Sequence, residues 1–549
     1  MTARAVTPPP ATRGHLAFDL VGIGLLALLV RVPAFLAPKG LTFDDGVFSL
    51  SALAMRDGGV PFAEVFSSQG PLFLPLVWAG DLLGLRTINS PRVLAVASGI
   101  AAAMLTYLVA RRLRDRTAGL LAGALVATSG ALTWVTGPLA ADGPALAFAV
   151  ATVLFALWFR DAPSTRNAVL VGLGTGAVLS TKSLEAPVLV VVGLVMAAPL
   201  LSGLRRREID RGALARILVA VGSSVVVFLA VSLPFGMAEV WDQSVRYRTD
   251  AADQRDIAAT AVKLLSTVWD RDLALVFFAA VCVLWALYAR LAGSSTGVDP
   301  NGVDPNGVDS NGGDPNGGST VTGATRSEVD RESSESTRDT RWWSRSAWSA
   351  DGTDWVPSDA LLVSSWLACT VVWLVVVVSP LWRPHVAAVT IPLALVIAYW
   401  RPPARVCAVA AVVAVPLVVI QLDGLLSPGR YSGLNGELVA QLEQLPDGAW
   451  VISDEPGVVW RAGRRTTDDL VDSSMLRRAQ GRYSAQSLLD AAQDPRVCAF
   501  VATSDERFGA FDELPAALED LGYEPLTVTG VDSVLFVRSD CSPGSGSGS

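Results

Sequence analysis

The chain has 549 residues, of which 51% are hydrophobic and only 17% are charged. Soluble domains usually carry about a quarter of charged residues, so this composition excludes a purely soluble protein. The formal net charge of −8 comes largely from one polar segment, residues 291–340, which indicates a solvated loop better than an acidic binding surface.

The apolar residues gather in twelve runs, many of which approach the roughly 20 residues that a helix needs to cross a bilayer. Arginine and lysine in short loops mark the cytoplasmic side, so all basic clusters should lie inside together. The clusters are residues 111–116, 160–166, 205–211, 341–345 and 401–405.

The run at residues 71–85 decides the number of spans. It is short, contains Asp81 and starts at Gly70-Pro71, which favours an outer juxtamembrane or re-entrant helix. Only this interpretation keeps every basic cluster inside, with the N-terminus inside and the C-terminal end outside. Eleven spans remain, expected at residues 16–36, 90–110, 117–135, 142–160, 167–183, 186–203, 213–234, 273–292, 358–379, 384–400 and 403–422.

We therefore expect a polytopic α-helical membrane protein with about eleven transmembrane helices, outer juxtamembrane helices and a small C-terminal α/β soluble domain. Its expected parts are a cytoplasmic tail (residues 1–15), a transmembrane domain (16–425) with a first outer loop (37–89) and a disordered cytoplasmic loop (293–357), an extracytoplasmic domain (430–541) and an added Gly-Ser linker (542–549). The disordered loop holds a five-residue repeat that begins Gly297-Val298-Asp299-Pro300-Asn301. Its Asp, Asn and Gly residues favour solvated turns, with calcium loops as the alternative.

The C-terminal domain combines short apolar strands with helical segments. Strands are expected at residues 449–453, 497–503 and 533–537, and helices at 437–445, 485–492 and 514–521. Outside the cytoplasm, Cys498 and Cys541 could form a disulfide, and two free thiols are the alternative. No cysteine spacing suggests a metal site.

The eleven-span topology places several polar residues at the outer mouth of the helices, where charged groups mark functional sites by default. They are Asp44, Asp45, Gln69, Asp142, Lys182, Glu185, Tyr247, Arg248, Arg383 and His385. Each has a structural alternative: Asp142 before Gly143-Pro144 fits a helix N-cap, and Lys182 can extend to the interface. As a set, an acid that can act as general base and cations that can hold a phosphate suit sugar transfer from a polyprenyl-phosphate donor.

Several short motifs carry a family resemblance over residues 16–400. They are Phe43-Asp44-Asp45, Gly58-Gly59, Gln69-Gly70-Pro71-Leu72, Ala141-Asp142-Gly143-Pro144 and Ser180-Thr181-Lys182. With them the sequence resembles the GT-C glycosyltransferases, in the branch of the protein O-mannosyltransferases and the lipid A aminoarabinose transferase. The resemblance implies that Asp44 is the catalytic acid, that Asp45 stands at the neighbouring acid, that Asp142 is the second acid and that Lys182 lies near the donor phosphate. Ser68-Gln69-Gly70 stands where the aminoarabinose branch has an acid and a lysine, which leaves the sugar and any metal ligand open.

The sequence thus predicts an inverting glycosyltransferase of a bacterial plasma membrane. Asp44, with Asp45 and Asp142, would serve catalysis; Lys182, Arg248, Arg383 and His385 would hold the donor phosphate; Gln69, Glu185 and Tyr247 would contact substrate. The expected partners are a polyprenyl-phosphate sugar, with mannose or arabinose as the sugar, an envelope glycan, lipid or protein acceptor, and membrane lipids, but no nucleic acid. No cofactor is expected, with a divalent cation left open, and the C-terminal domain would bind the acceptor or gate the site.

Two other functions fit a polytopic chain with charges near its spans. A transporter or lipid flippase would also have many spans, but transporters often show internal repeats and midplane sites, which are not evident here. A non-catalytic sugar-binding or assembly partner is the third interpretation, and the Asp44-Asp45 pair argues against it.

Overall fold

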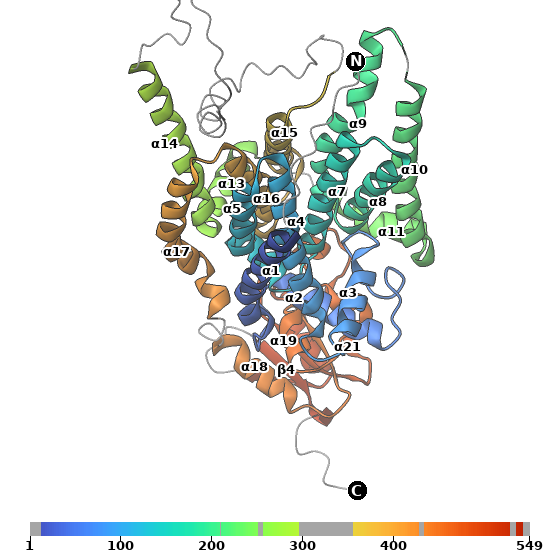
Figure 1. The fold of residues 1–549 in the computed structure, drawn as a ribbon. Helices are drawn as coiled ribbons and strands as arrows, with labels where there is room; N and C mark the ends of the chain where they lie inside the picture. The colour runs from blue at the N-terminus through green and yellow to red at the C-terminus, as the bar shows by residue number, and fades with distance from the viewer. Residues whose placement is uncertain are drawn as a thin grey trace, which may run out of the picture.

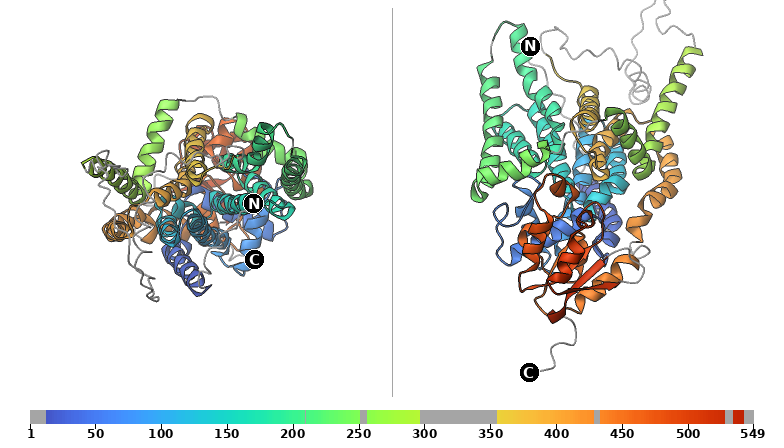
Figure 2. Two further views of the ribbon diagram at one scale, coloured as in Figure 1. Left: turned by 45° about the horizontal axis from the view of Figure 1, so that its top comes forward. Right: turned by 180° about the vertical axis from the view of Figure 1, so that it is seen from behind.

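The structure is a computed structural model that describes residues 13–208, 210–250, 256–295, 355–427, 433–527 and 534–541. The predicted repeat, most of the polar loop around it and the terminal linker lie outside these residues. In the described part, a helical bundle carries a small sheet-containing unit at one end (Figures 1 and 2).

Helices occupy all the positions at which spans were predicted. They are α1 (Arg13–Phe35), α4 (Val93–Leu113), α5 (Arg116–Thr128), α6 (Gly130–Thr136), α7 (Asp142–Asp161), α8 (Thr165–Thr181), α9 (Val188–Arg205), α10 (Arg211–Ser232), α14 (Leu273–Ser295), α15 (Asp359–Val372), α16 (Ala387–Trp400) and α17 (Ala404–Leu426). Among the described residues, 9 helices are long and apolar enough to cross a membrane, and the bent pair α5–α6 would make up to 10. The 17-residue α8 fills the remaining predicted position. The prediction of a polytopic helical membrane protein is confirmed.

One predicted span, residues 117–135, is not a straight helix. α5 and α6 meet at an angle of 59°. Ser129 leaves the helical conformation (φ −57°, ψ 129°) and caps α6 by accepting a hydrogen bond from the Leu132 amide at 3.0 Å. Asp272 holds the break, because its carboxylate accepts from Ser129 Oγ at 2.7 Å and from the Ala131 amide at 3.2 Å.

The basic ends of the helices meet at the end of the bundle opposite the C-terminal unit. Arg112 pairs with Asp161 at 2.6 Å and Arg401 with Asp115 at 2.6 Å, which joins α4 to α7 and α5 to the end of α16. Arg160 also pairs with Asp359 at the start of α15. The cluster at residues 341–345 lies outside the described residues. The grouping agrees with the predicted topology, while the side of the membrane that this end faces stays a prediction.

The first outer loop forms α2 (Phe43–Arg56) and α3 (Phe73–Leu83). With 11 residues, α3 is too short to cross a bilayer, as expected for the run at residues 71–85. Its Asp81 carboxylate accepts hydrogen bonds from Arg56 Nε at 2.8 Å and Arg56 Nη2 at 2.6 Å, which fastens α3 to α2.

α2 packs against the C-terminal unit. Its apolar residues share one buried core with residues of the C-terminal unit, including Val458 and Trp460. The contact is close: a Cβ added at Gly46 would lie 2.3 Å from the backbone nitrogen of Gly457. Glycine at position 46 is therefore required for this helix to reach the unit.

The C-terminal unit contains a four-stranded sheet in the order β1-β2-β4-β3. The strands are β1 (Trp450–Ser453), β2 (Val497–Ala502), β3 (Tyr523–Thr527) and β4 (Val534–Arg538), and the helices are α18 (Gly433–Glu443), α19 (Pro456–Arg461), α20 (Met475–Ala479), α21 (Ala485–Ala492) and α22 (Leu514–Asp520). β1 and β2 are parallel and the other pairs antiparallel. β3 was not predicted; it is an edge strand that contains Pro525, a residue that weakens the sequence pattern of a strand.

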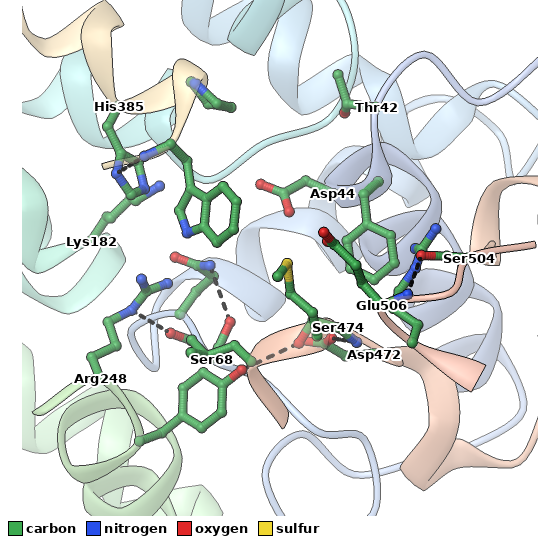
Figure 3. Close-up of a pocket in the computed structure, with 18 residues that line it drawn as sticks. Thr42, Asp44, Ser68, Lys182, Arg248, His385, Asp472, Ser474, Ser504 and Glu506 are labelled. Carbon is green, nitrogen blue, oxygen red and sulfur yellow. Dashed lines mark hydrogen bonds between the residues drawn. The ribbon is translucent and has the colours of Figure 1, made fainter. Parts of the chain in front are cut away.

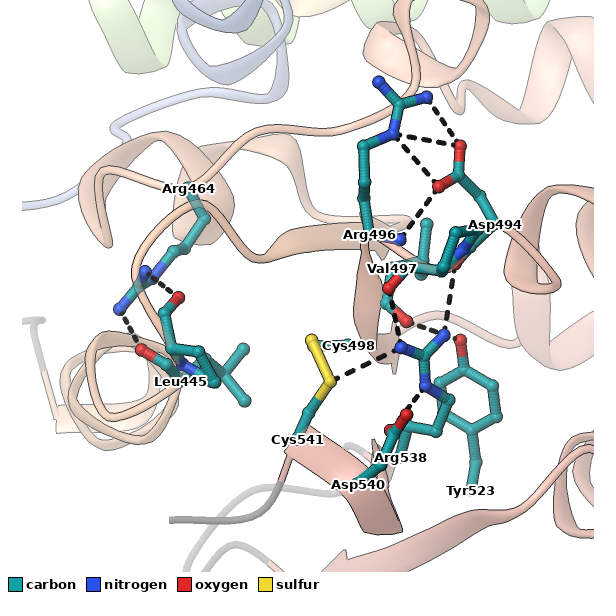
Figure 4. Close-up of a disulfide and its surroundings, with 12 residues drawn as sticks. Leu445, Arg464, Asp494, Arg496, Val497, Cys498, Tyr523, Arg538, Asp540 and Cys541 are labelled. Carbon is teal, nitrogen blue, oxygen red and sulfur yellow. Dashed lines mark hydrogen bonds and ion pairs between the residues drawn. A yellow bond between two sulfur atoms is a disulfide. The ribbon is translucent and has the colours of Figure 1, made fainter. Parts of the chain in front are cut away.

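Cys498 of β2 and Cys541, just after β4, form a disulfide (Figure 4). Of the two alternatives open from the sequence, the structure therefore has the disulfide. Disulfides persist in oxidising compartments, so this bond agrees with an extracytoplasmic unit.

The remaining helices of the described chain connect the bundle to the site. They are α11 (Met237–Trp241), a π-helical turn (Asp242–Arg246), α12 (Tyr247–Asp250) and α13 (Ile257–Arg271). Asp242 of the π-helical turn accepts Arg482 Nη1 at 2.6 Å, which ties this segment to the C-terminal unit.

Candidate active site

A cavity of about 420 Å³ lies between the helical bundle and the C-terminal unit (Figure 3). It is lined from the start of α2, the turn before α3, the end of α8, α12, residues 382–385 and two loops of the C-terminal unit. Of the predicted site residues, it brings together Asp44, Gln69, Lys182, Tyr247, Arg248 and His385.

Asp44 lines this cavity from the first turn of α2. Thr42 caps the helix by accepting a hydrogen bond from the Asp45 amide at 3.2 Å, which fixes the turn that carries both acids. Burial raises the pKa of Asp44 to about 6. Asp142 and Asp472 also raise it, and Lys182 lowers it. A carboxylate with a pKa near neutrality can both accept and release a proton.

Asp45 points away from the cavity, in contrast to its predicted role beside Asp44. It is fully buried and accepts Arg92 Nε at 3.0 Å, with a second bond from Arg92 Nη2. The Leu139 amide donates a further bond at 2.9 Å. We therefore assign Asp45 to the anchoring of α2, since consecutive helix residues face different directions and this carboxylate is occupied.

Lys182 follows α8 with an extended backbone (φ −157°, ψ 117°), and its side chain lines the cavity. Its Nζ lies 2.8 Å from Asp142 Oδ2, and both side chains are buried. Asp142 does not line the cavity but contacts Lys182, and its catalytic role stays a prediction. Glu185 lies behind the cavity too, and burial, together with the neighbouring charge of Asp142, raises its pKa to about 8. Asp142 Oδ1 and Glu185 Oε1 have no hydrogen-bond partner among the described residues.

The other predicted cations divide into two groups. Arg248 lines the cavity, and its Nε donates to the Ser68 carbonyl at 3.1 Å. His385 lines it as well, and its Nδ1 accepts from the Trp382 amide at 3.3 Å. Arg383 is exposed and is not among the lining residues; the cavity is bounded there by Trp382, not by the predicted arginine.

Gln69 and Tyr247 both line the cavity, and their contacts with substrate stay a prediction. Gln69 is 5% exposed, and its Oε1 has no hydrogen-bond partner among the described residues. The Tyr247 hydroxyl lies 3.2 Å from Ser474 Oγ, which links α12 to the C-terminal unit. Burial raises the pKa of Tyr247, so its hydroxyl stays protonated at neutral pH.

A second cavity of about 320 Å³ adjoins the first and shares Lys182, Arg248 and His385 with it. Its other walls are mainly apolar. They come from the turn before α3, from α8 and the turn after it, from α10, from the π-helical turn and α12, and from the end of the span that starts with α15. The apolar lining residues include Leu179, Leu184, Phe228, Trp373, Val377 and Val378. The cations thus stand where a polar cavity meets an apolar one.

Sequence reasoning missed the contribution of the C-terminal unit. Its lining residues are Asp472, Ser474, Met475, Leu476, Ser504, Glu506 and Arg507. They belong to no recognisable motif. They are part of the site because the fold brings them close to the start of α2. The only available signal was the predicted outer location of the whole unit.

The described residues contain no group of three or more His, Cys, Asp or Glu side chains that could hold a metal ion. On the bundle side of the cavity, Asp44 faces Lys182, Arg248 and His385, and these cationic and titratable groups suit an anionic part of a substrate. The need for a divalent cation stays open as a prediction.

Comparison with known proteins supports the class suggested by fold and site. A family model described as dolichyl-phosphate-mannose-protein mannosyltransferase matches residues 81–235, which include Asp142 and Lys182. The crystal structure of ArnT from Cupriavidus metallidurans bound to undecaprenyl phosphate has a TM-score of 0.57 and 13% identity, over 97% of this chain and 100% of that chain. The apo form of the same protein has a TM-score of 0.57 and 12% identity, over 96% and 98%. No curated protein matches the sequence.

The chain therefore shares its fold with ArnT over 97% of its length. The fold and the family match together support a glycosyltransferase of the GT-C superfamily, in the branch that the sequence motifs indicated.

Proposed function

We propose that this chain transfers a sugar from a polyprenyl-phosphate donor to an acceptor on the outer face of a bacterial plasma membrane, with inversion at the sugar carbon. The observation that carries the proposal is the junction of the two cavities: Lys182, Arg248 and His385 line both, and Asp44 faces them across the polar one. A donor with an apolar tail, a phosphate and a sugar has its three parts in this order.

The donor phosphate lies at the cationic junction. Lys182 and Arg248 supply charge-assisted hydrogen bonds, which are strong where water is excluded. The polyprenyl chain enters the apolar cavity between α8, α10 and the span of α15. The ArnT structure that shares this fold was solved with undecaprenyl phosphate, which supports the same kind of donor here.

Asp44 acts as general base. It takes the proton of the acceptor hydroxyl as the hydroxyl oxygen bonds to the sugar C1, while the bond between C1 and the phosphate oxygen breaks. The electron pair of that bond leaves with the polyprenyl phosphate, whose charge Lys182 and Arg248 stabilise. Because the acceptor attacks from the side of Asp44, opposite the phosphate, the configuration at C1 inverts. A pKa of about 6 keeps Asp44 ionised at neutral pH and still basic enough to accept the proton.

Two residues support this reaction from outside the cavity. Asp142 holds Lys182 in place through the 2.8 Å ion pair. Glu185, neutral at pH 7 because of its raised pKa, adds no charge that would weaken the phosphate site.

The proposal is tested with the full chain in liposomes that contain a radiolabelled polyprenyl-phosphate sugar, in the presence of an envelope extract as acceptor. We expect release of polyprenyl phosphate together with label in the acceptor fraction, and an inverted anomeric bond by NMR. Val377→Trp, which narrows the apolar cavity, should raise the KM for the donor at least tenfold.

Val372→Trp is the matched control, because Val372 is exposed on α15 and does not line either cavity. An equal KM for the donor in the two variants would contradict the binding of the polyprenyl chain in this cavity. Movement of intact donor across the bilayer without sugar transfer would support the transporter alternative instead.

A further inference from the structure

The polar cavity has two sides of opposite charge (Figure 3). Lys182, Arg248 and His385 stand along one side, and the C-terminal unit places Asp472 and Glu506 along the other. If the cationic side holds the donor phosphate, the acidic side faces the acceptor.

Hydrogen bonds hold the two loops that form the acidic side. Asp454 is fully buried, and its carboxylate accepts from the Thr503 amide at 2.8 Å and the Ser504 amide at 3.0 Å, which fixes the loop that carries Glu506. In the second loop, the Ser474 amide donates to Asp472 Oδ1 at 2.9 Å. Both loops therefore present their polar atoms in fixed positions.

One cation also lines this side, but its charge is already engaged. Arg507 Nη2 lies 3.4 Å from Glu455 Oε2, and its guanidinium stacks over the ring of Phe43 at 4.9 Å from the ring centre. Asp44, Asp472 and Glu506 thus leave the acceptor side with net negative charge.

Gln69 gives an independent indication of what the cavity binds. Its side chain is 5% exposed, it lines the cavity, and its Oε1 lacks a partner among the described residues. A buried carbonyl oxygen without a donor is costly, and a ligand hydroxyl can satisfy it. Carboxylates and this carbonyl oxygen all require hydrogen-bond donors from the ligand.

We infer that Asp472, Glu506 and Gln69, with the hydroxyls of Ser474 and Ser504, form an acceptor subsite for an uncharged, hydroxyl-rich glycan. The inference rests on the proposed function and adds the class of acceptor. Sugar hydroxyls donate to the carboxylates and to Gln69, while one hydroxyl meets Asp44. A phosphate-bearing acceptor is rejected, because its charge would face Asp472 and Glu506, while Arg507 on the same side is paired with Glu455.

The test uses the purified full chain with a radiolabelled polyprenyl-phosphate sugar and two soluble acceptor pairs, octyl mannoside and octyl glucoside, each with and without a 6-phosphate. We expect transfer to at least one neutral glycoside and at least tenfold lower kcat/KM for its phosphate. Glu506→Gln and Asp472→Asn should each raise the KM for the neutral glycoside about tenfold, as expected for loss of a hydrogen bond to a charged group. In both variants, the ratio of kcat/KM for the neutral glycoside to kcat/KM for its 6-phosphate should also become smaller.

Glu519→Gln is the control, because Glu519 is an exposed acid of α22 that does not line the cavity, and it should keep wild-type values. Thermal unfolding of each variant verifies that it folds. Preference for the phosphorylated glycosides, or unchanged KM in both variants, would overturn the inference while the transferase stands. Failure to consume the donor with any acceptor or with water would overturn the proposed function and the inference together.

Discussion

Neighbouring acids of α2 are predicted to have opposite effects on stability when each is changed to asparagine. Asp45 is paired with Arg92, and both side chains have no exposed surface. Asp45→Asn leaves the guanidinium buried without its counter-charge, and breaking a buried pair in this way costs about 3–5 kcal/mol. The variant should therefore unfold at a clearly lower temperature.

Asp44→Asn should instead leave stability unchanged or increase it. The pKa of Asp44 rises from 3.8 to about 6 in the folded protein, so ionisation of this group above pH 6 opposes folding. The opposition amounts to at most about 3 kcal/mol at pH 7, at about 1.4 kcal/mol for each unit of pKa, and it disappears as the pH falls toward 4. Removing the charge removes this cost.

The assay is thermal unfolding in detergent at pH 7, followed with a fluorophore that reacts with the buried thiols of Cys282 and Cys407 as they become accessible. A lowered midpoint for Asp45→Asn together with an equal or raised midpoint for Asp44→Asn is expected. Equal destabilisation by both changes, or none by Asp45→Asn, would refute the division of roles between the two acids.

Three further outcomes are expected. Because Asp44 must be ionised to act as base, kcat/KM should rise through about pH 6, and Asp472→Asn should move this midpoint to lower pH, since it removes a charge that raises the pKa of Asp44; an unmoved midpoint would show that another group titrates. Cys498→Ser should break the bond to Cys541 and destabilise the protein by about 2–5 kcal/mol, seen as a lower unfolding temperature, whereas an unchanged temperature would show that the two thiols do not pair. In the variant Arg114→Cys, the new cysteine should not react with an impermeant thiol reagent added to intact cells, because the predicted topology places it on the cytoplasmic side. Rapid labelling of this cysteine would contradict that topology.

The sequence was sufficient for the architecture because apolar runs and basic clusters act locally. The short α3 followed from a brief run with Asp81, and the structure explains that acid by its contact with Arg56. The break between α5 and α6 could not be predicted, because Asp272, which accepts the hydrogen bond from Ser129, lies far away along the chain.

The candidate site was predictable on one side only. The motifs around Asp44 and Lys182 named the residues that the bundle supplies, but they could not show that Asp45 turns away toward Arg92. The acidic side depends on the packing of α2 against the C-terminal unit, which brings Glu506 to the cavity without any sequence signal of its own.

The central claim is that Asp44 takes the proton of the acceptor during sugar transfer. Its most direct test is the rate of transfer from a radiolabelled polyprenyl-phosphate sugar by wild type and Asp44→Asn, with Asp57→Asn at the other end of α2 as control. Loss of the base should lower kcat by about 10²–10⁴-fold while donor binding and folding are retained, and the control should keep wild-type activity. Transfer by Asp44→Asn at the wild-type rate would contradict the account.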